Sequence, residues 1–205
     1  MSTELLPLFP LSLVLLPAMP LPLHIFEERY KEMMSDIVPA GVEFGVVLAK
    51  EGGIVNIGCT ARVERILRSY PDGRLDLIAV GQRRFQIASL DDDKSYLRAQ
   101  VEFFNDDDAS EVPPELHERA VAAYRSLIEN PGEEEEPSFD LVRLSFQLAQ
   151  LISDLDKRQT VLVLRSEVKR LEYLVGIVPE YLVQRERTAR ANRLAPLNGH
   201  PKLAL

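Results

Sequence analysis

The sequence is poor in the residues that build disulfides, metal sites and phosphate-binding loops. It contains one cysteine, Cys59, and three histidines, His24, His117 and His200, which lie far apart along the chain. A single cysteine excludes an internal disulfide and is compatible with a reducing compartment. A zinc site needs three or four converging ligands, and a phosphate-cradling loop needs the pattern GxxxxGK(S/T), which is missing. The sequence therefore predicts no metal and no cofactor.

Long uninterrupted hydrophobic runs are also missing. The apolar opening is cut by five prolines between Pro7 and Pro22, and the first Lys or Arg is Arg29. A secretory signal starts with positive charge and has an unbroken apolar core, and a membrane span needs about 20 apolar helical residues. Proline removes an amide donor and interrupts a helix. We therefore expect a cytoplasmic protein without a membrane anchor, in which this opening forms strands and turns.

Positive charge is in short supply. There are 24 Lys and Arg against 32 Asp and Glu, a net charge of -8. Because nucleic-acid binding depends on cations that displace counterions from phosphates, this balance argues against a bulk electrostatic grip on DNA or RNA. The acids gather in three runs, at 91–93, 106–108 and 133–136. Such runs are typical of solvated loops, and they lack the glycine and the ligand spacing of a calcium loop.

The first half of the chain has the pattern of short strands separated by turns. Strands are predicted at 42–50, 59–66, 74–87 and 96–104, where β-branched residues or a period of two dominate. Ile66 and Leu67 break the alternation, which predicts a β-bulge near Arg65. An early helix is predicted at 26–38, because its apolar residues share one stripe.

The second half changes to the period of helices. Helices are predicted at 115–130, at 138–155 and, as a short helix followed by a longer one, at 156–178, with Pro179 kinking or ending the last. Strands followed by helices indicate an α+β fold. We expect a strand-rich part at 1–108, a helical part at 109–195 and a flexible tail at 196–205.

One motif invites a catalytic interpretation. Ser166 and Lys169 fit the SxxK pattern of some serine hydrolases. The companion motifs SDN and KTG are absent, and a serine just before an apolar helical run is more simply a helix N-cap. Nothing else combines a nucleophile with a base, so the sequence predicts no enzyme.

The opening stretch carries a family resemblance. LPLFPLSLVLLPAMPLPLHIFEERY, at 6–30, resembles the start of the Lon substrate-binding domain, the N-terminal domain of the ATP-dependent protease Lon. The similarity continues through IGCTARVERI, DGRLDLIAVGQRRFQI and YLRAQVEFF, and more loosely through KRQTVLVLRSEVKRLEYLVGIV. It covers about residues 4–178, and the segment from about Pro179 departs from the family pattern.

This resemblance implies a PUA-like β-barrel followed by an α-helical bundle. It also implies a non-catalytic, free-standing module, because the ATPase and Ser-Lys protease modules of Lon have no counterpart in these residues. Such a module would recognise unfolded or exposed polypeptides. It would serve as an adaptor or regulator in ATP-dependent proteolysis beside a full-length Lon. Seven residues of the matching motifs become candidate polypeptide contacts: Pro22, His24, Phe26, Arg29, Tyr30, Arg84 and Phe85. A homo-oligomer is compatible with the family.

Two other interpretations stay open. Because PUA-like barrels include RNA binders, an RNA-binding module is the alternative function, and it requires a contiguous basic face formed by Arg62, Arg65, Arg68, Arg83 and Arg84. The third interpretation is a pocket for a small ligand within the barrel.

Overall fold

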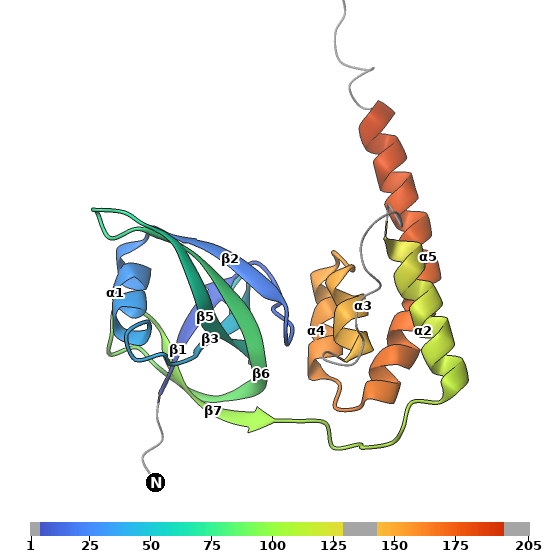
Figure 1. Ribbon diagram of the computed structural model, residues 1–205, viewed down its shortest axis with the longest axis horizontal. Helices are drawn as coiled ribbons and strands as arrows, with labels where there is room; N and C mark the ends of the chain where they lie inside the picture. The colour runs from blue at the N-terminus through green and yellow to red at the C-terminus, as the bar shows by residue number, and fades with distance from the viewer. Residues whose placement is uncertain (1–4, 129–142, 195–205) are drawn as a thin grey trace, which may run out of the picture.

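The computed structural model describes residues 5–128 and 143–194, which form a strand-rich part followed by a helical part (Figure 1). The strand-rich part contains β1 (Leu6–Leu11), β2 (Pro20–Ile25), α1 (Glu28–Ile37), β3 (Phe44–Lys50), β4 (Gly53–Ile54), β5 (Ile57–Ser69), β6 (Leu75–Asp91) and β7 (Arg98–Phe104). The helical part contains α2 (Pro114–Leu127), α3 (Leu144–Gln150), α4 (Leu155–Val163) and α5 (Glu167–Leu194). The predicted order of strands, then helices, is confirmed.

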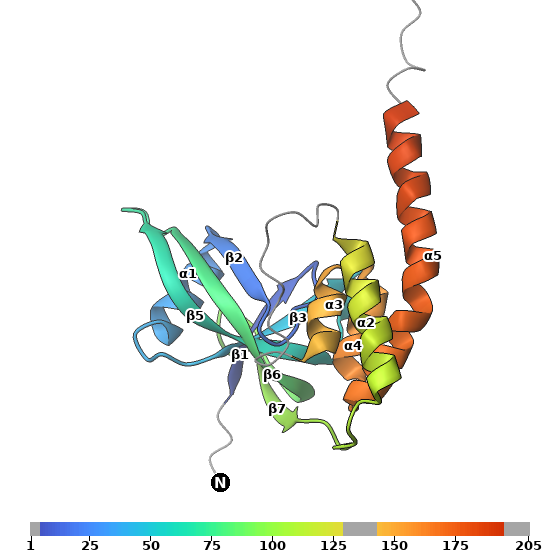
Figure 2. The same cartoon turned by 45° about the vertical axis from the view of Figure 1, so that its right-hand side comes forward.

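The strands pair in the order β1-β7-β6-β5-β3-β4, with β2 paired to β6. β1 also pairs with β3, in parallel, so the pairings lead from β1 through β7, β6, β5 and β3 back to β1. All the other strand pairs are antiparallel. Figure 2 shows the same strands from another side, with the four helices of the second part gathered beyond one end of the sheet.

A long hairpin formed by β5 and β6 projects from the rest of the sheet (Figure 1). Its turn is closed by a hydrogen bond from the amide of Tyr70 to the carbonyl of Arg74, at 3.0 Å, and Gly73 there has a φ of 82°. Glycine adopts this left-handed conformation without steric cost. The pairing of the two strands shifts register three times, and the shift between Val63 and Arg65 confirms the predicted bulge.

One hydrophobic core draws on both parts of the chain. Its buried side chains include Phe44 and Leu48 from β3 as well as Phe146 from α3 and Val161 from α4. Cys59 is fully buried in this core, as its place in an alternating strand predicts. The core therefore extends across the boundary between strands and helices.

The helical part departs from the predicted boundaries at one place. The single helix predicted at 138–155 is wrong, because α3 ends at Gln150 and α4 begins at Leu155; residues 138–142 lie outside the described part. The break is fixed by tertiary contacts that periodicity does not reveal. The amide of Ser153 donates to Tyr181 Oη at 2.9 Å, and Asp154 caps α4 by accepting from the amide of Lys157 at 3.0 Å.

The last helix, α5, begins at a serine cap and continues through a proline. Ser166 Oγ accepts a hydrogen bond from the amide of Lys169 at 3.2 Å, so its role as the N-cap of α5 is confirmed. Pro179 does not end α5, which continues to Leu194. The tail predicted at 196–205 lies outside the described residues.

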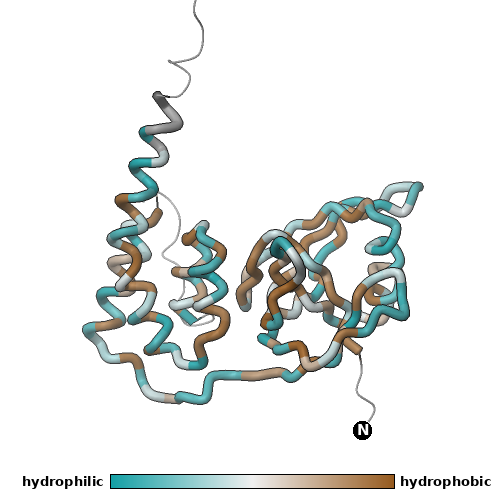
Figure 3. The backbone as a smooth tube through the Cα atoms, turned by 180° about the vertical axis from the view of Figure 1, so that it is seen from behind, coloured by the Kyte–Doolittle hydropathy of each residue, from teal (hydrophilic) through white to brown (hydrophobic). Residues whose placement is uncertain are grey.

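Hydrophobic and hydrophilic residues are interspersed along the strands and helices (Figure 3). Within 5–128 and 143–194, no helix is both long enough and apolar enough to cross a membrane.

Candidate functional site

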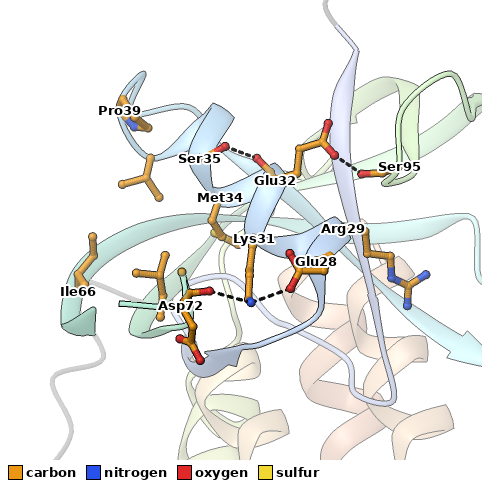
Figure 4. A pocket seen from close by; sticks show the side chains of 13 residues that line it. Glu28, Arg29, Lys31, Glu32, Met34, Ser35, Pro39, Ile66, Asp72 and Ser95 are labelled. Carbon is orange, nitrogen blue, oxygen red and sulfur yellow. Dashed lines mark hydrogen bonds and ion pairs between the residues drawn. The ribbon is translucent and has the colours of Figure 1, made fainter. Parts of the chain in front are cut away.

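A groove of about 760 Å³ lies between α1 and the β5–β6 hairpin (Figure 4). Its apolar lining comes from three elements and one loop: Met34 and Val38 at and beyond the end of α1, Pro39, Ile66 of β5 and Leu75 of β6. Met34 faces inward because it belongs to the apolar stripe of α1 that also covers the core. The groove therefore offers an apolar surface that is open to solvent.

Charged residues hold the two walls of the groove together. Lys31 of α1 donates hydrogen bonds to the carboxylate of Glu28, at 2.8 Å, and to the backbone carbonyl of Asp72 in the hairpin turn, at 2.9 Å (Figure 4). Glu32 accepts from the hydroxyl of Ser95, at 2.6 Å. These contacts position α1 against the hairpin tip and against the segment before β7.

The groove continues into a second hollow of about 440 Å³ along β5. The two hollows share Val38 and Ile66, and the second is lined by residues 62–66 of β5 together with Gly41 and Val42. We call the two together the α1–β5 groove. It follows the strand from the hairpin tip toward the start of β3.

Exposed apolar side chains accompany this groove. Ile66 is 42% exposed and Val42 39%, and both line it. Leu67, the next residue of β5, is 55% exposed. Exposed apolar side chains gathered around a hollow are typical of sites that bind another molecule.

A smaller hollow of about 180 Å³ beside β1 and β2 is lined by four of the predicted contact residues: His24, Phe26, Arg29 and Tyr30. His24 Nδ1 lies 2.5 Å from Asp76 Oδ1, and the ring of Phe26, a side chain 57% exposed, stacks on His24 with centroids 5.8 Å apart. Pro22 lies on β2, two residues before His24, and is exposed. Because Leu75 lines the groove and successive side chains of a strand alternate, Asp76 and its partner His24 face away from the groove.

The hydrogen bonds of His24 and Tyr70 lower the pKa of Asp76 below its usual value. The carboxylate of Asp76 thus stays ionised and ties β2 to the hairpin tip.

The side chains of Arg29, Tyr30, Arg84 and Phe85 differ in exposure. Arg29 is exposed, pairs with Glu27 at 2.8 Å and lines the groove beside α1. Tyr30 and Phe85 are buried in two apolar clusters, Tyr30 against the ring of Phe9 with centroids 4.1 Å apart. Arg84 is buried as well, so only Arg29 of these four is placed to contact a ligand.

Arg84 belongs to a buried ion network between the strands and the helices. It donates to Asp106 at 2.6 Å and to the backbone carbonyl of Leu164 at 2.7 Å. Arg170 of α5, which is fully buried, donates to the same carboxylate at 2.6 and 2.7 Å and to Glu167 at 2.7 Å. Burial lowers the pKa of Arg84, and the Asp106 carboxylate opposes that effect. This is a structural arrangement in which each arginine has a carboxylate partner.

The five arginines of the alternative interpretation do not make one free basic face. Arg84 is buried, and Arg62 and Arg83 both pair with Glu43, at 3.1 and 3.0 Å. Arg65 and Arg68 remain exposed on β5.

The described residues offer neither a metal-binding group nor a reactive thiol. No group of three His, Cys, Asp or Glu side chains there could hold a metal ion. Burial raises the pKa of the Cys59 thiol to about 12, so this cysteine is not a nucleophile at neutral pH.

Sequence reasoning missed the groove residues. Ile66 and Leu67 were noticed only as a break in alternation, and Met34 only as part of an apolar stripe. The usable signal was that break itself, since two consecutive apolar residues point to opposite faces of a strand and are both buried only where both faces are covered.

Sequence comparisons find similar proteins among the Lon proteases. The Lon protease of Flavobacterium johnsoniae is 26% identical over 155 residues, which are 69% of this chain and 19% of that protein. Lon protease 2 of Herpetosiphon aurantiacus is 28% identical over 198 residues, 87% of this chain and 24% of that protein. The chain thus spans a quarter or less of the length of these relatives.

Solved structures show the same fold. The Lon N-terminal domain protein from Xanthomonas campestris matches with a TM-score of 0.68 at 29% identity, covering 84% of this chain and 98% of that one. The N-terminal domain of Mycobacterium avium complex Lon protease matches with a TM-score of 0.58 at 16% identity, over 86% of this chain and 98% of that one. At that identity the second match is a likeness of fold alone.

The family model described as the ATP-dependent protease La (LON) substrate-binding domain matches residues 5–180. The match includes every strand, α1 to α4 and the first half of α5. The chain therefore belongs to the LON substrate-binding domain family.

Proposed function

We propose that this chain is a non-catalytic domain that holds unfolded or exposed polypeptide segments, as an adaptor or regulator in ATP-dependent proteolysis. The observation that carries the proposal is the α1–β5 groove, whose apolar lining is open to solvent and flanked by the exposed Ile66 and Leu67. A full-length Lon and a second copy of the chain are the proposed protein partners. Within this proposal the strand pairings that return to β1 support a PUA-like barrel.

Direct polypeptide contact is proposed for only four of the seven motif residues. Pro22, His24, Phe26 and Arg29 are exposed, whereas the other three are buried. Of these, His24, Phe26 and Arg29 line the smaller hollow of about 180 Å³ beside β1 and β2. RNA binding is the weaker alternative, because Arg84 is buried and two more of the required arginines share an ion pair with Glu43.

The test is fluorescence anisotropy of a labelled, permanently unfolded polypeptide titrated with the protein at low and high salt. Ile66→Lys places a charge in the apolar groove, and we expect it to raise the dissociation constant about tenfold, or about 1.4 kcal/mol. Leu90→Lys is the matched control, because Leu90 is a similarly exposed apolar residue of β6 outside the groove. It should leave binding within about twofold.

The outcomes separate clearly. Saturable binding that survives high salt and weakens in Ile66→Lys alone supports apolar recognition by the groove. No binding at any protein concentration reached would contradict the proposed function. Binding that disappears at high salt in every variant would favour an electrostatic, RNA-type surface instead.

A further inference from the structure

β5 has an open edge beside the groove. Of its residues, 59–61 pair with β3 on one side and with β6 on the other. From Arg62 to Ser69 the strand pairs with β6 alone, as far as the described residues reach. An unpaired strand edge presents backbone N–H and C=O groups that are ready to pair with another chain.

The shape of the second hollow shows that it lies against this edge. Five consecutive residues of β5, from Arg62 to Ile66, line it. Successive side chains of a strand point to opposite faces, so a hollow on one face would meet only every second residue. A hollow that meets five in a row lies beside the backbone itself.

The position next to this edge is the continuation of β3. β3 begins at Phe44, opposite Ala61, and the residues before it leave the sheet toward α1. Gly41, with a φ of 63°, makes that turn, and Val42 lies along the hollow. The space that a longer β3 would fill is therefore left to the groove.

We propose that the α1–β5 groove takes its polypeptide as an added β-strand on the edge of β5 between Arg62 and Ser69, and that it favours segments combining apolar side chains with carboxylates. This inference rests on the proposed function and specifies its substrate class. In strand addition the backbone hydrogen bonds supply affinity for any extended segment, and alternate side chains enter pockets. Such recognition suits unfolded chains, because it reads little sequence.

Charge on the edge selects for acidic segments. Arg65 and Arg68 are exposed, and neither has a carboxylate within salt-bridge distance among the described residues. Glu64, an exposed acid, lies on the same stretch of β5 and lines the second hollow, and Glu43 pairs with Arg62. Arg68 also lies over the ring of Tyr70, 4.6 Å from its centroid. From 62 to 69 the strand carries three arginines and one acid, so a net positive charge remains where the added strand would lie.

The bulges of β5 set the length of the added strand. Register shifts between Val63 and Arg65 and between Ile66 and Arg68 interrupt the regular edge. Bulges and charged residues are how natural edges avoid uncontrolled association. We therefore expect short pairing and rapid release, which suits a domain that passes a polypeptide on.

The test uses a capped, labelled peptide that alternates valine and glutamate, in three forms: unmodified, N-methylated at every valine, and N-methylated at every glutamate. A strand uses only one of its edges to pair with β5, so methylation should weaken binding about tenfold on one set and leave it nearly unchanged on the other. Equal binding of all three forms would overturn strand addition.

The preference for acidic segments is tested by comparing an acidic with a basic peptide. A peptide that alternates valine and lysine should bind several-fold more weakly than the glutamate peptide, and Arg65→Glu should reverse that preference. If the variant leaves the preference unchanged, the acidic-segment part of the proposal is wrong.

The result also distinguishes this inference from the function on which it rests. If the unfolded polypeptide binds but methylation has no positional effect, strand addition alone fails. If neither polypeptide nor peptide binds, the proposed function fails with it. A dimer in sedimentation velocity that dissociates in Arg65→Glu would show a second copy on this edge and would overturn the peptide as its occupant.

Discussion

Among single residues, Asp106 is the buried carboxylate that forms an ion pair with both Arg84 and Arg170. Its carboxylate, 5% exposed, accepts hydrogen bonds from Arg84 and from both terminal nitrogens of Arg170. Burial raises its pKa, but these arginines outweigh burial and hold the pKa below its usual range. Removing a partner from a buried ion pair leaves charge without compensation, which is far costlier than losing an exposed pair.

We expect Asp106→Ala to lower the free energy of unfolding by about 3–5 kcal/mol, measured by urea denaturation at neutral pH. Asp107→Ala is the matched control, because Asp107 is 70% exposed and pairs with Arg165 at 3.5 Å, so its loss should cost about 1 kcal/mol or less. Equal effects of the two substitutions would contradict the role given to the buried network.

The wild type and Asp106→Ala also give a test by pH. The folded-state pKa of Asp106 is depressed, so its stabilising contribution is complete well above the unfolded-state pKa of about 4 and is lost as the pH falls through the folded-state value. The difference in stability between the wild type and Asp106→Ala should therefore shrink as the pH falls below about 4.

At the scale of elements, β6 is the strand on which the sheet depends, since β2, β5 and β7 all pair with it. It passes the loop between β1 and β2 so closely that a Cβ at Gly81 would lie 2.1 Å from the carbonyl oxygen of Leu16. The backbone of Gly81 also exchanges hydrogen bonds with Ala18 and Met19, at 2.8 and 3.0 Å. The glycine of the family motif thus permits a close approach of two backbones.

Gly81→Ala should lower the free energy of unfolding by about 1–3 kcal/mol or more, because backbone cannot yield as a flexible side chain does. Gly176→Ala is the control, since nothing lies within 4 Å of a Cβ there and α5 should gain up to about 1 kcal/mol from the better helix former. Urea denaturation of both variants checks the opposite signs, and a tolerated Gly81→Ala would contradict the close approach.

Elements were predictable from the sequence where local pattern decides them. The strands, the bulge near Arg65 and the Ser166 cap each follow from a few neighbouring residues. The break between α3 and α4 was not predictable, because the apolar period runs through it and the partner that fixes it, Tyr181, is 28 residues from Ser153. Arg84 was misjudged as a surface contact for the same reason, since its carboxylate lies on a later segment.

The candidate site likewise combines residues that local sequence could identify with residues that only the fold brings together. Motif resemblance identified His24 and Phe26, which are indeed exposed, but the α1–β5 groove arises from residues of α1, β5 and β6 that no single stretch brings together. Only the folded arrangement places an open strand edge beside an apolar hollow.

At the scale of the whole molecule, the groove and the helices lie at opposite ends of the strand-rich part (Figures 1 and 2). The helices are nevertheless tied to the sheet by apolar and polar contacts. Leu162 of α4 is buried in the core shared with β3, and Gln159 Nε2 donates to the backbone carbonyl of Ile57 at 3.0 Å. We therefore propose that the parts at 1–108 and 109–195 fold as one cooperative unit, and that the helices stabilise the groove from a distance.

Leu162→Ala tests this coupling, because it removes a buried side chain from the helical part alone and should cost about 2–5 kcal/mol. Hydrogen exchange measured by mass spectrometry in increasing urea reports each segment separately, and we expect the β5–β6 hairpin to lose protection at the same lowered midpoint as α4. Val163→Ala, one residue along and exposed, should shift neither segment appreciably. If only the helices shift in Leu162→Ala, the two parts unfold independently. The helices would then contribute nothing to the stability of the groove. A fragment limited to the strands would be expected to bind polypeptide as well as the whole chain does.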